Sequence, residues 1–255
     1  MQTKTIKQLN QLNLDFYQQF SNSFSDSRNY YWEGWQKLIP VIEKLIRNKQ
    51  VGEKLSVADV GCGNGRFASF LYETFPQIQI GYLGLDSSSH LLKIAGERRK
   101  IFESARNSWQ VKNFDLVENL LAKKKNRLGS NFDLITMFGV LHHIPSFELR
   151  QKLVQSLLDQ LKPNGRLVIS LWRFPQFDRL KKKIVSPNVA KIEETDLEEN
   201  DYILDWKKSE SAYRYCHYTS LEEMKEIVEQ KGIIEETFLA DAKEKTANRY
   251  VIIKL

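Results

Sequence analysis

The sequence predicts an α/β fold in which a doubly wound, mostly parallel sheet of seven strands carries helices on both faces. Short β-rich runs alternate with helical patterns from residue 56 to residue 172. This alternation is typical of parallel strands joined by crossover helices. Phe132–Phe138 is largely apolar along its whole length, as expected of a central strand that is covered on both sides. Two further strand patterns, 235–239 and 249–254, are expected to close the sheet as an antiparallel pair.

Helices and strands follow one another in a regular order. Ser87 begins a helical pattern with a run of serines suited to capping. The sequence Lys162-Pro163-Asn164-Gly165 marks a turn before a strand. Residues 1–48 are predicted to be helical, with an apolar stripe over 38–46. The remaining predicted strands are 56–60, 78–85, 109–114 and 166–172, and the remaining predicted helices are 66–74, 87–104, 146–161 and 221–230.

These patterns divide the chain into four parts. Residues 1–50 are expected to form an N-terminal helical cap, and residues 51–173 a ligand-binding core. Residues 174–220 contain a charged stretch that is longer than a normal connection, so we expect a lid or insertion that contributes to the binding site. Residues 221–255 are expected to supply a last helix and the closing strands of the core.

Composition and charge exclude several classes of protein. The 255 residues are 42% hydrophobic and include 14 Phe, 10 Tyr and 5 Trp, which is enough for an ordinary core. No apolar run is long enough to span a membrane, and residues 1–10 lack an apolar signal core, so we expect a cytoplasmic protein without membrane association. Cys62 and Cys216 form no CxxC pair, so we expect no metal site. The net charge of +6 permits a polyanionic partner without requiring one.

One glycine-rich motif follows the first predicted strand directly. Asp59 precedes three alternate glycines, Gly61, Gly63 and Gly65, and a helix begins after them. Glycine lets the backbone turn sharply and approach a ligand, and the helix offers its N-terminal amides. The spacing differs from the GxGxxG of dinucleotide sites and suits a ligand with a cationic amino group near Asp59. Asp86 follows the next strand, where a carboxylate can hold a ribose diol.

These residues resemble the class I S-adenosylmethionine-dependent methyltransferases, a Rossmann-like family. The likeness covers the glycine motif, Asp86, the pair Phe114-Asp115, the segment from Phe132 to Ile144, and Leu161 to Gly165, where Asn164 replaces a glycine. The resemblance implies S-adenosyl-L-methionine as cofactor. The cofactor-binding residues that it implies are Asp59, Gly61, Gly63, Gly65, Asp86, Ser87, Asp115 and Phe138.

Three flanking features resemble one subfamily, the methyltransferases that esterify the carboxymethyl group of the wobble uridine in tRNA. They are the segment from Phe24 to Trp32, the pair Leu171-Trp172, and Asp201 to Trp206 followed by 213–217. The chain departs from the family in places, since Cys216 replaces an aromatic residue. The resemblance implies the anticodon stem-loop of tRNA as partner, and a small zinc-binding activator subunit as a possible second one.

Esterification of a carboxylate needs little acid–base chemistry. A carboxylate is ionised and nucleophilic at pH 7 because such acids titrate near 4. We therefore expect residues that orient it rather than a general base. The candidates for catalytic roles are Arg28, Arg214, His217 and His143. His142 and His143 are not expected to bind a metal, because adjacent histidines do not face one ligand. Candidates for base stacking are Trp172 and Trp206, and those for phosphate binding are Lys123, Lys124, Lys125, Lys181, Lys182 and Lys183.

The sequence leaves open two alternatives to a tRNA methyltransferase. A similar core could methylate oxygen or carbon in a small molecule such as a metabolite acid, a quinone or a lipid precursor. The chain could also be an inactive cofactor-binding scaffold subunit, although the complete set of Asp59, the three glycines and Asp86 argues against this.

Overall fold

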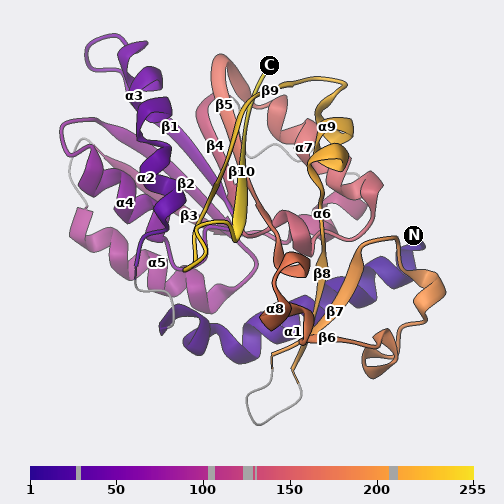
Figure 1. The fold of residues 1–255 in the computed structure, drawn as a ribbon. Helices are drawn as coiled ribbons and strands as arrows, with labels where there is room; N and C mark the ends of the chain where they lie inside the picture. Colours follow the sequence, from indigo (N-terminus) through magenta and orange to yellow (C-terminus); the bar gives the residue numbers. More distant parts are fainter. Residues whose placement is uncertain (27–29, 103–106, 123–128, 130, 207–211) are drawn as a thin grey trace.

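The main body of the molecule is a seven-stranded sheet with the strand order β3-β2-β1-β4-β5-β10-β9 (Figure 1). The computed structural model describes residues 1–26, 30–102, 107–122, 129, 131–206 and 212–255. The first five strands in this order are parallel, and β10 is antiparallel to both β5 and β9. The expected α/β class with its closing antiparallel pair is confirmed. The strands are β1 (Leu55–Val60), β2 (Ile80–Asp86), β3 (Ser108–Asn113), β4 (Phe132–Phe138), β5 (Leu161–Trp172), β9 (Ile233–Ala240) and β10 (Asn248–Lys254).

Helices cover both faces of this sheet because neighbouring residues along each strand point in opposite directions. Leu134 belongs to one buried cluster, and Ile135 belongs to the other. The cluster of Leu134 includes residues of α2 (Glu33–Lys37), α3 (Ile39–Arg47), α4 (Arg66–Thr74) and α5 (Ser89–Phe102). The cluster of Ile135 includes residues of α6 (Leu116–Leu121), α7 (Phe147–Leu158) and α9 (Leu221–Val228). None of the described helices is both long and apolar enough to cross a membrane.

A second, three-stranded sheet lies beside the main body. Its order is β6-β7-β8, and both pairs are antiparallel. The N-terminal helix α1 (Thr3–Asp26) packs against β8, and Figure 1 shows it running alongside this small sheet. The sequence predicted a lid over this region but no sheet, because its strands are short and separated by charged segments. The strands are β6 (Ile184–Val185), β7 (Asp201–Asp205) and β8 (Tyr213–His217), and a short helix, α8 (Asp178–Lys181), precedes them.

Three local predictions differ from the structure. The predicted turn Lys162–Gly165 lies inside β5, where the register with β4 shifts between Phe132 and Leu134 and so accommodates the extra residues. The helical region 1–48 is divided into α1, α2 and α3. The six-residue helix α6 was not predicted, because it is too short for a helical period to be visible.

Candidate active site

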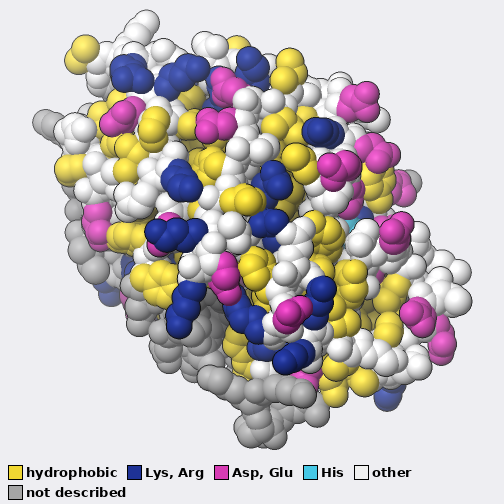
Figure 2. Space-filling model, viewed as in Figure 1, with side chains coloured by type: hydrophobic (Ala, Val, Ile, Leu, Met, Phe, Trp, Pro, Cys, Tyr) yellow, Lys and Arg dark blue, Asp and Glu magenta, His cyan; other side chains and the backbone are white. Residues whose placement is uncertain are grey.

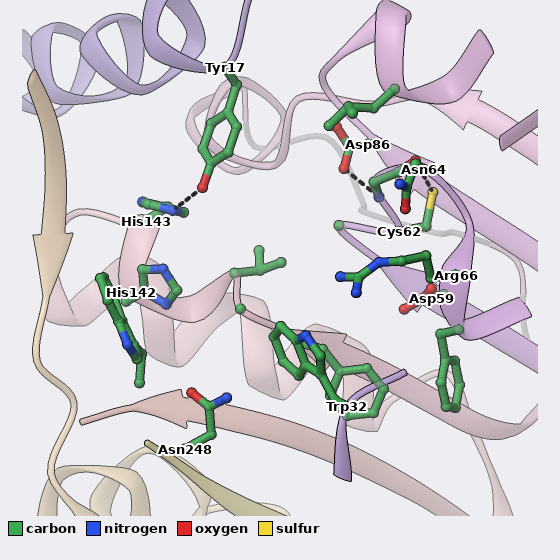
Figure 3. A pocket seen from close by; sticks show the side chains of 18 of the residues that line it. Tyr17, Trp32, Asp59, Cys62, Asn64, Arg66, Asp86, His142, His143 and Asn248 are labelled. Atoms are coloured by element: carbon green, nitrogen blue, oxygen red, sulfur yellow. Dashed lines mark hydrogen bonds between the residues drawn. The ribbon is translucent and has the colours of Figure 1, made fainter. Parts of the chain in front are cut away.

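A cavity of about 1040 Å³ opens at the carboxyl ends of the central strands and is lined on one side by α1. Ligands of open α/β sheets bind at this edge. We call one side the cofactor end, defined by Asp59, Gly63 and Asp86, and the other the acceptor end, defined by Tyr17, His143, Trp172 and Arg214. Figure 3 shows Asp86 and Asp59 across the cavity from His142 and His143. The volume is sufficient for two ligands of moderate size.

The glycine loop builds the floor of the cofactor end. Gly61, Gly63 and Gly65 all have positive φ angles, of 74°, 54° and 76°. A Cβ at Gly61 would lie 2.1 Å from Val140, and one at Gly65 would lie 2.8 Å from Trp109, whereas one at Gly63 would have nothing within 4 Å. Gly63 therefore leaves open space for a ligand. Gly65 does not line the cavity, so its role is close packing of the helix rather than the expected cofactor contact.

Asp86 lies at the end of β2 and lines the cavity. Its carboxylate accepts hydrogen bonds from Gly63 N (2.9 Å) and Ser88 N (2.8 Å). Burial raises the pKa of Asp86, while these backbone donors oppose the shift. A carboxylate offers about four acceptor positions, so Asp86 retains capacity for the two hydroxyls of a ribose.

Asp59 is a buried acid at the base of the same loop. Its oxygens accept hydrogen bonds from Tyr82 Oη (2.7 Å) and Thr136 Oγ1 (2.8 Å). Burial raises the pKa of Asp59 to about 6, although the two hydroxyl donors lower it. The ionised carboxylate is therefore present at neutral pH, and a cationic group in the cavity would stabilise it further.

Arg66 is a cofactor-end residue that the sequence analysis missed. It follows the last glycine at the first position of α4, and its guanidinium lies 5.9 and 5.5 Å from the ring centroids of Trp32 and Trp35. Its Nη1 donates to the Tyr30 carbonyl (2.8 Å). Burial lowers the pKa of Arg66 to about 10, so it is still a cation at pH 7. Its position directly after the last glycine of the motif is the sequence feature that could have identified it.

These residues fit S-adenosylmethionine. Asp59 and Arg66 present opposite charges to the cavity, which complement the ammonium and carboxylate of its amino-acid moiety. Asp86 would hold the ribose. Ser87 and Phe138, which the family resemblance assigns to the cofactor, also line the cavity.

Asp115 lines the cofactor end and also forms hydrogen bonds that stabilise the fold. One oxygen caps α6 by accepting from Glu118 N (3.0 Å), and the other accepts from Asn10 Nδ2 of α1 (3.0 Å). Asp115 thus ties α1 to the core, next to the place expected for the adenine.

Arg214 of β8 dominates the acceptor end. Its guanidinium lies 5.2, 5.0 and 5.3 Å from the ring centroids of Phe16, Trp172 and Trp206. The residue is only 7% exposed and lines the cavity. Among the described residues, no carboxylate lies within ion-pair distance of it. A buried cation without an acid partner is costly, so an anionic ligand in the cavity would be strongly favoured.

Tyr17 and His143 form a hydrogen-bonded pair on the same side of the cavity (Figure 3). His143 Nδ1 lies 2.9 Å from the Tyr215 carbonyl, which can only accept, so Nδ1 carries the proton. For a neutral imidazole, Nε2 is then the acceptor from Tyr17 Oη at 2.8 Å. Tyr17 was not predicted, because it precedes the segments that resemble the family.

A metal at this place is disfavoured by chemistry. Ligand atoms of His142, His143 and Cys216 lie within 4.8 Å of one another. However, His143 Nδ1 donates to a carbonyl, and burial raises the pKa of Cys216 to about 12, so its sulfur is a thiol. The other ring nitrogen of His143 lies 2.8 Å from Tyr17 Oη, so both of its nitrogens are engaged within the protein, and we assign no ion to this cluster.

Two expectations for the acceptor side need correction. His217 does not line the cavity; its nitrogens lie 2.8 Å from Asp201 Oδ1 and Glu223 Oε2 in a buried network. Trp206 also lies outside the cavity lining and packs behind Arg214 and beside Lys183. Lys181 and Lys182 are exposed on and after α8, outside the cavity lining, and their expected contacts with phosphates stay a prediction. The predicted Arg28, Lys123, Lys124 and Lys125 lie outside the described residues.

The sheet order, the open glycine loop and the complementary charges define an S-adenosylmethionine-dependent methyltransferase. The chain belongs to the methyltransferase domain family, whose model matches residues 15–233.

Known proteins with similarity to the chain act on different acceptors. It is 27% identical over 173 residues to tRNA (carboxymethyluridine(34)-5-O)-methyltransferase ALKBH8 of Macaca fascicularis, covering 68% of this chain and 22% of that relative. It is 23% identical over 169 residues to the mitochondrial ubiquinone biosynthesis O-methyltransferase of Schizosaccharomyces pombe, covering 63% of this chain and 57% of the relative. Both alignments leave much of the relative unmatched. Magnesium protoporphyrin IX methyltransferase of Synechocystis PCC 6803 shares the fold, with a TM-score of 0.59, 16% identity and coverage of 94% and 98%.

Proposed function

We propose that this methyltransferase esterifies a carboxylate, and that its acceptor is the carboxymethyl group of 5-carboxymethyluridine at the tRNA wobble position. The observation that carries the proposal is Arg214, a buried cation that lines the acceptor end without an acid partner among the described residues. Its planar guanidinium can hold a carboxylate through two parallel hydrogen bonds.

The reaction requires positioning above all. S-adenosylmethionine supplies an electrophilic methyl group on a sulfonium. The acceptor carboxylate attacks it in line, so a carboxylate oxygen–carbon bond forms as the sulfur–carbon bond breaks. Because the acceptor is already ionised, no proton has to be removed. Arg214 would orient the carboxylate, and Trp172 beside it lines the cavity and can stack on a base.

Two further features support a wobble-uridine acceptor. The relative from Macaca fascicularis carries that activity in its name. Arg214 belongs to the segment of β8 that resembles the same subfamily, and it lies at the acceptor end. The partners of the reaction would be tRNA and, as in that subfamily, a small zinc-binding activator.

The test is methylation of tRNA isolated from a strain that lacks wobble-uridine esterification, followed by nucleoside mass spectrometry. The protein is assayed alone and together with a zinc-binding activator of the subfamily. We expect the methyl ester of 5-carboxymethyluridine. Absence of the ester under both conditions, with S-adenosylmethionine still bound, would contradict the tRNA acceptor.

The pair Tyr17–His143 favours a second candidate, O-methylation of a hydroxyl group in a small molecule. A hydroxyl acceptor must lose a proton during transfer. That proton can pass to Tyr17 while the Tyr17 proton passes to His143 Nε2, which is 2.8 Å away. The name of the ubiquinone-pathway relative is compatible with such an acceptor.

The variant Tyr17→Phe separates the two candidates. Loss of general base catalysis lowers the rate about 10²- to 10⁴-fold. We expect only a small loss with the carboxylate acceptor, because that reaction transfers no proton. A rate that falls about a hundredfold and loses its dependence on pH would favour the hydroxyl acceptor.

A further inference from the structure

The rim of the acceptor end carries two more cations, which the reaction itself does not use. Arg179 of α8 and Lys243 of the β9–β10 turn both line the cavity. Both are exposed, whereas Arg214 is buried at 7% exposure. The cavity thus has one inner cation and two outer ones. A single carboxylate accounts for the inner cation only.

The charge of the cavity changes from one side to the other. Asp59, Asp86 and Asp115 line the cofactor end, which suits a cofactor with a sulfonium and an ammonium. Arg214, Arg179 and Lys243 also line the cavity, and so do the acids Asp241 and Glu244 of the β9–β10 turn. Figure 2 shows Lys and Arg side chains gathered around α8 and the tip of the β9–β10 hairpin. Asp241 accepts hydrogen bonds that hold the turn, and Glu244 forms an exposed pair with Arg179, so the cations of the rim can still interact with a second negative charge of a ligand.

The turn that carries Lys243 is held firmly. Asp241 Oδ1 accepts from Gly34 N (2.9 Å), and its Oδ2 accepts from Asn248 Nδ2 (2.8 Å) and Tyr250 Oη (2.7 Å). Asp241 and Ala242 have φ angles of 71° and 59°, which non-glycine residues rarely adopt. Such backbone persists where its surroundings hold it, and it is found preferentially at ligand sites.

The turn is also joined to the segment before α8. Arg173 Nη1 donates to the Thr246 carbonyl (2.7 Å), and Arg173 N donates to the Ala247 carbonyl (2.9 Å). The two segments that carry the rim cations are therefore joined to each other, although they lie far apart in the sequence.

Both rim cations are available to a ligand. Lys243 forms no ion pair with another described residue. Arg179 pairs with Glu244 at 3.3 Å, but their side chains are 56% and 40% exposed. Exposed pairs of this kind contribute little free energy, so a phosphate can replace Glu244. Arginine binds phosphate in a bidentate manner, and lysine binds it as a point charge.

We infer that Arg179 and Lys243 bind a backbone phosphate next to the methylated nucleotide, so that the acceptor is recognised as part of an RNA strand. This inference rests on the proposed carboxylate acceptor. Phosphate contacts position a nucleic acid, while Arg214 and Trp172 would select the modified base. A metabolite acid with one carboxylate would leave the rim unused.

The test compares three acceptors: a synthetic anticodon stem-loop with 5-carboxymethyluridine, the corresponding 5′-mononucleotide and the free nucleoside. The variants are Arg179→Gln, Lys243→Gln and the double variant. Lys245→Gln is the matched control, because Lys245 is an exposed lysine of the same turn that does not line the cavity. Selectivity is measured as the ratio of kcat/KM for the stem-loop to that for the nucleoside.

We expect each rim variant to lower this selectivity several-fold. We also expect the slope of the logarithm of the stem-loop binding constant against the logarithm of the salt concentration to become shallower by about one. The control should change neither. Unchanged selectivity and slope in the double variant, with the stem-loop still methylated, would overturn the rim site and leave the proposed function standing. If the rim variants lower kcat/KM for the mononucleotide as much as for the stem-loop, the proposal that an RNA strand is recognised would be overturned in favour of a free nucleotide.

The proposed function can also fail while the phosphate site on the rim stands. If the wild-type protein, assayed alone and together with the zinc-binding activator, methylates none of the three acceptors, the proposed function fails. Fluorescence anisotropy with the same stem-loop, labelled with a fluorophore, then tests whether the rim cations bind a phosphate. A salt slope that falls in the rim variants and not in Lys245→Gln supports the phosphate site, and equal slopes overturn it.

Discussion

Asp59 and Arg66 are two buried, oppositely charged residues that line the cofactor end of the cavity. One is an acid whose pKa burial raises to about 6, and the other is a cation that keeps its charge despite burial. A zwitterionic amino-acid moiety neutralises both at once. Because neither has an ion-pair partner among the described residues, cofactor binding should relieve the cost of burying each charge.

Cofactor affinity should therefore depend on pH with a defined sign. The ammonium of S-adenosylmethionine pairs with the ionised form of Asp59, so affinity should be high above pH 6 and decline as pH falls through about 6. Calorimetric titration at several pH values measures this. Asp59→Asn should remove the pH dependence and weaken binding by about tenfold or more. A variant that retains the wild-type pH profile would exclude Asp59 as the titrating group.

At the residue scale, the sequence predicted the acids of the cofactor end well. Asp59 and Asp86 stand in a fixed order with the glycines, so local spacing was informative. Tyr17 and Arg66 were missed, and His217 was assigned to the wrong place. Their surroundings depend on how α1 and β8 pack on the core, and no local pattern encodes that packing.

The small sheet is held to the core by a buried charged network. Arg150 of α7 donates to Glu223 (2.9 Å) and Glu198 (3.2 Å), and His217 bridges Asp201 and Glu223. Burial alone would lower the pKa of His217, but its hydrogen bonds to the two carboxylates raise it. Through these two contacts His217 connects β8, which carries Arg214, to β7 and α9.

This network predicts a loss of stability at alkaline pH. The folded-state pKa of His217 lies above its ordinary value of 6.5, so its contribution is complete below 6.5 and disappears as pH rises through the folded-state pKa. The pKa of Glu223 is lowered from 4.5, so its contribution disappears on acidification. Urea unfolding at a series of pH values should show both losses. His217→Asn should lower the unfolding free energy by about 3 kcal/mol and abolish the alkaline loss.

An alkaline loss that survives in His217→Asn would show that another group is responsible. Asn keeps a hydrogen-bonding side chain but cannot take up a proton in this range, so the comparison isolates the titration.

Helix α2 should be sensitive to any added side chain at Gly34. A Cβ there would lie 2.1 Å from the Tyr250 ring, so Gly34→Ala must displace α2 from the sheet. Overpacking of this kind costs about 1–3 kcal/mol. Gly96→Ala in α5 is the control, because its Cβ meets nothing within 4 Å; it should be neutral or stabilise by up to about 1 kcal/mol. Equal melting temperatures for the two variants would show that α2 does not pack as described.

At the element scale, the longest and most regular segments were predictable. Helix Arg66–Thr74 and strand Phe132–Phe138 have the predicted bounds. The strands β6, β7 and β8 were not predicted, because segments of two to five residues have no measurable period. Their pairing depends on contacts between distant parts of the chain.

Across the whole molecule, one cavity separates the two tasks of a methyltransferase. The core supplies an acidic end for the cofactor, while α1, the small sheet and the β9–β10 turn supply the acceptor end. Mutations on the two sides should therefore have separable effects. Changes at Asp59 should affect cofactor affinity, and changes at Arg214 should affect turnover.

The most direct test of this account is the kinetics of Arg214→Gln with 5-carboxymethyluridine in tRNA as acceptor. We predict an unchanged dissociation constant for S-adenosylmethionine and a fall in kcat/KM for the acceptor of about a hundredfold, since a charged bidentate contact contributes roughly 2–3 kcal/mol. Arg214→Lys should be intermediate, because it keeps the charge but loses the second hydrogen bond. Wild-type turnover in Arg214→Gln would contradict the claim that the acceptor end binds a carboxylate.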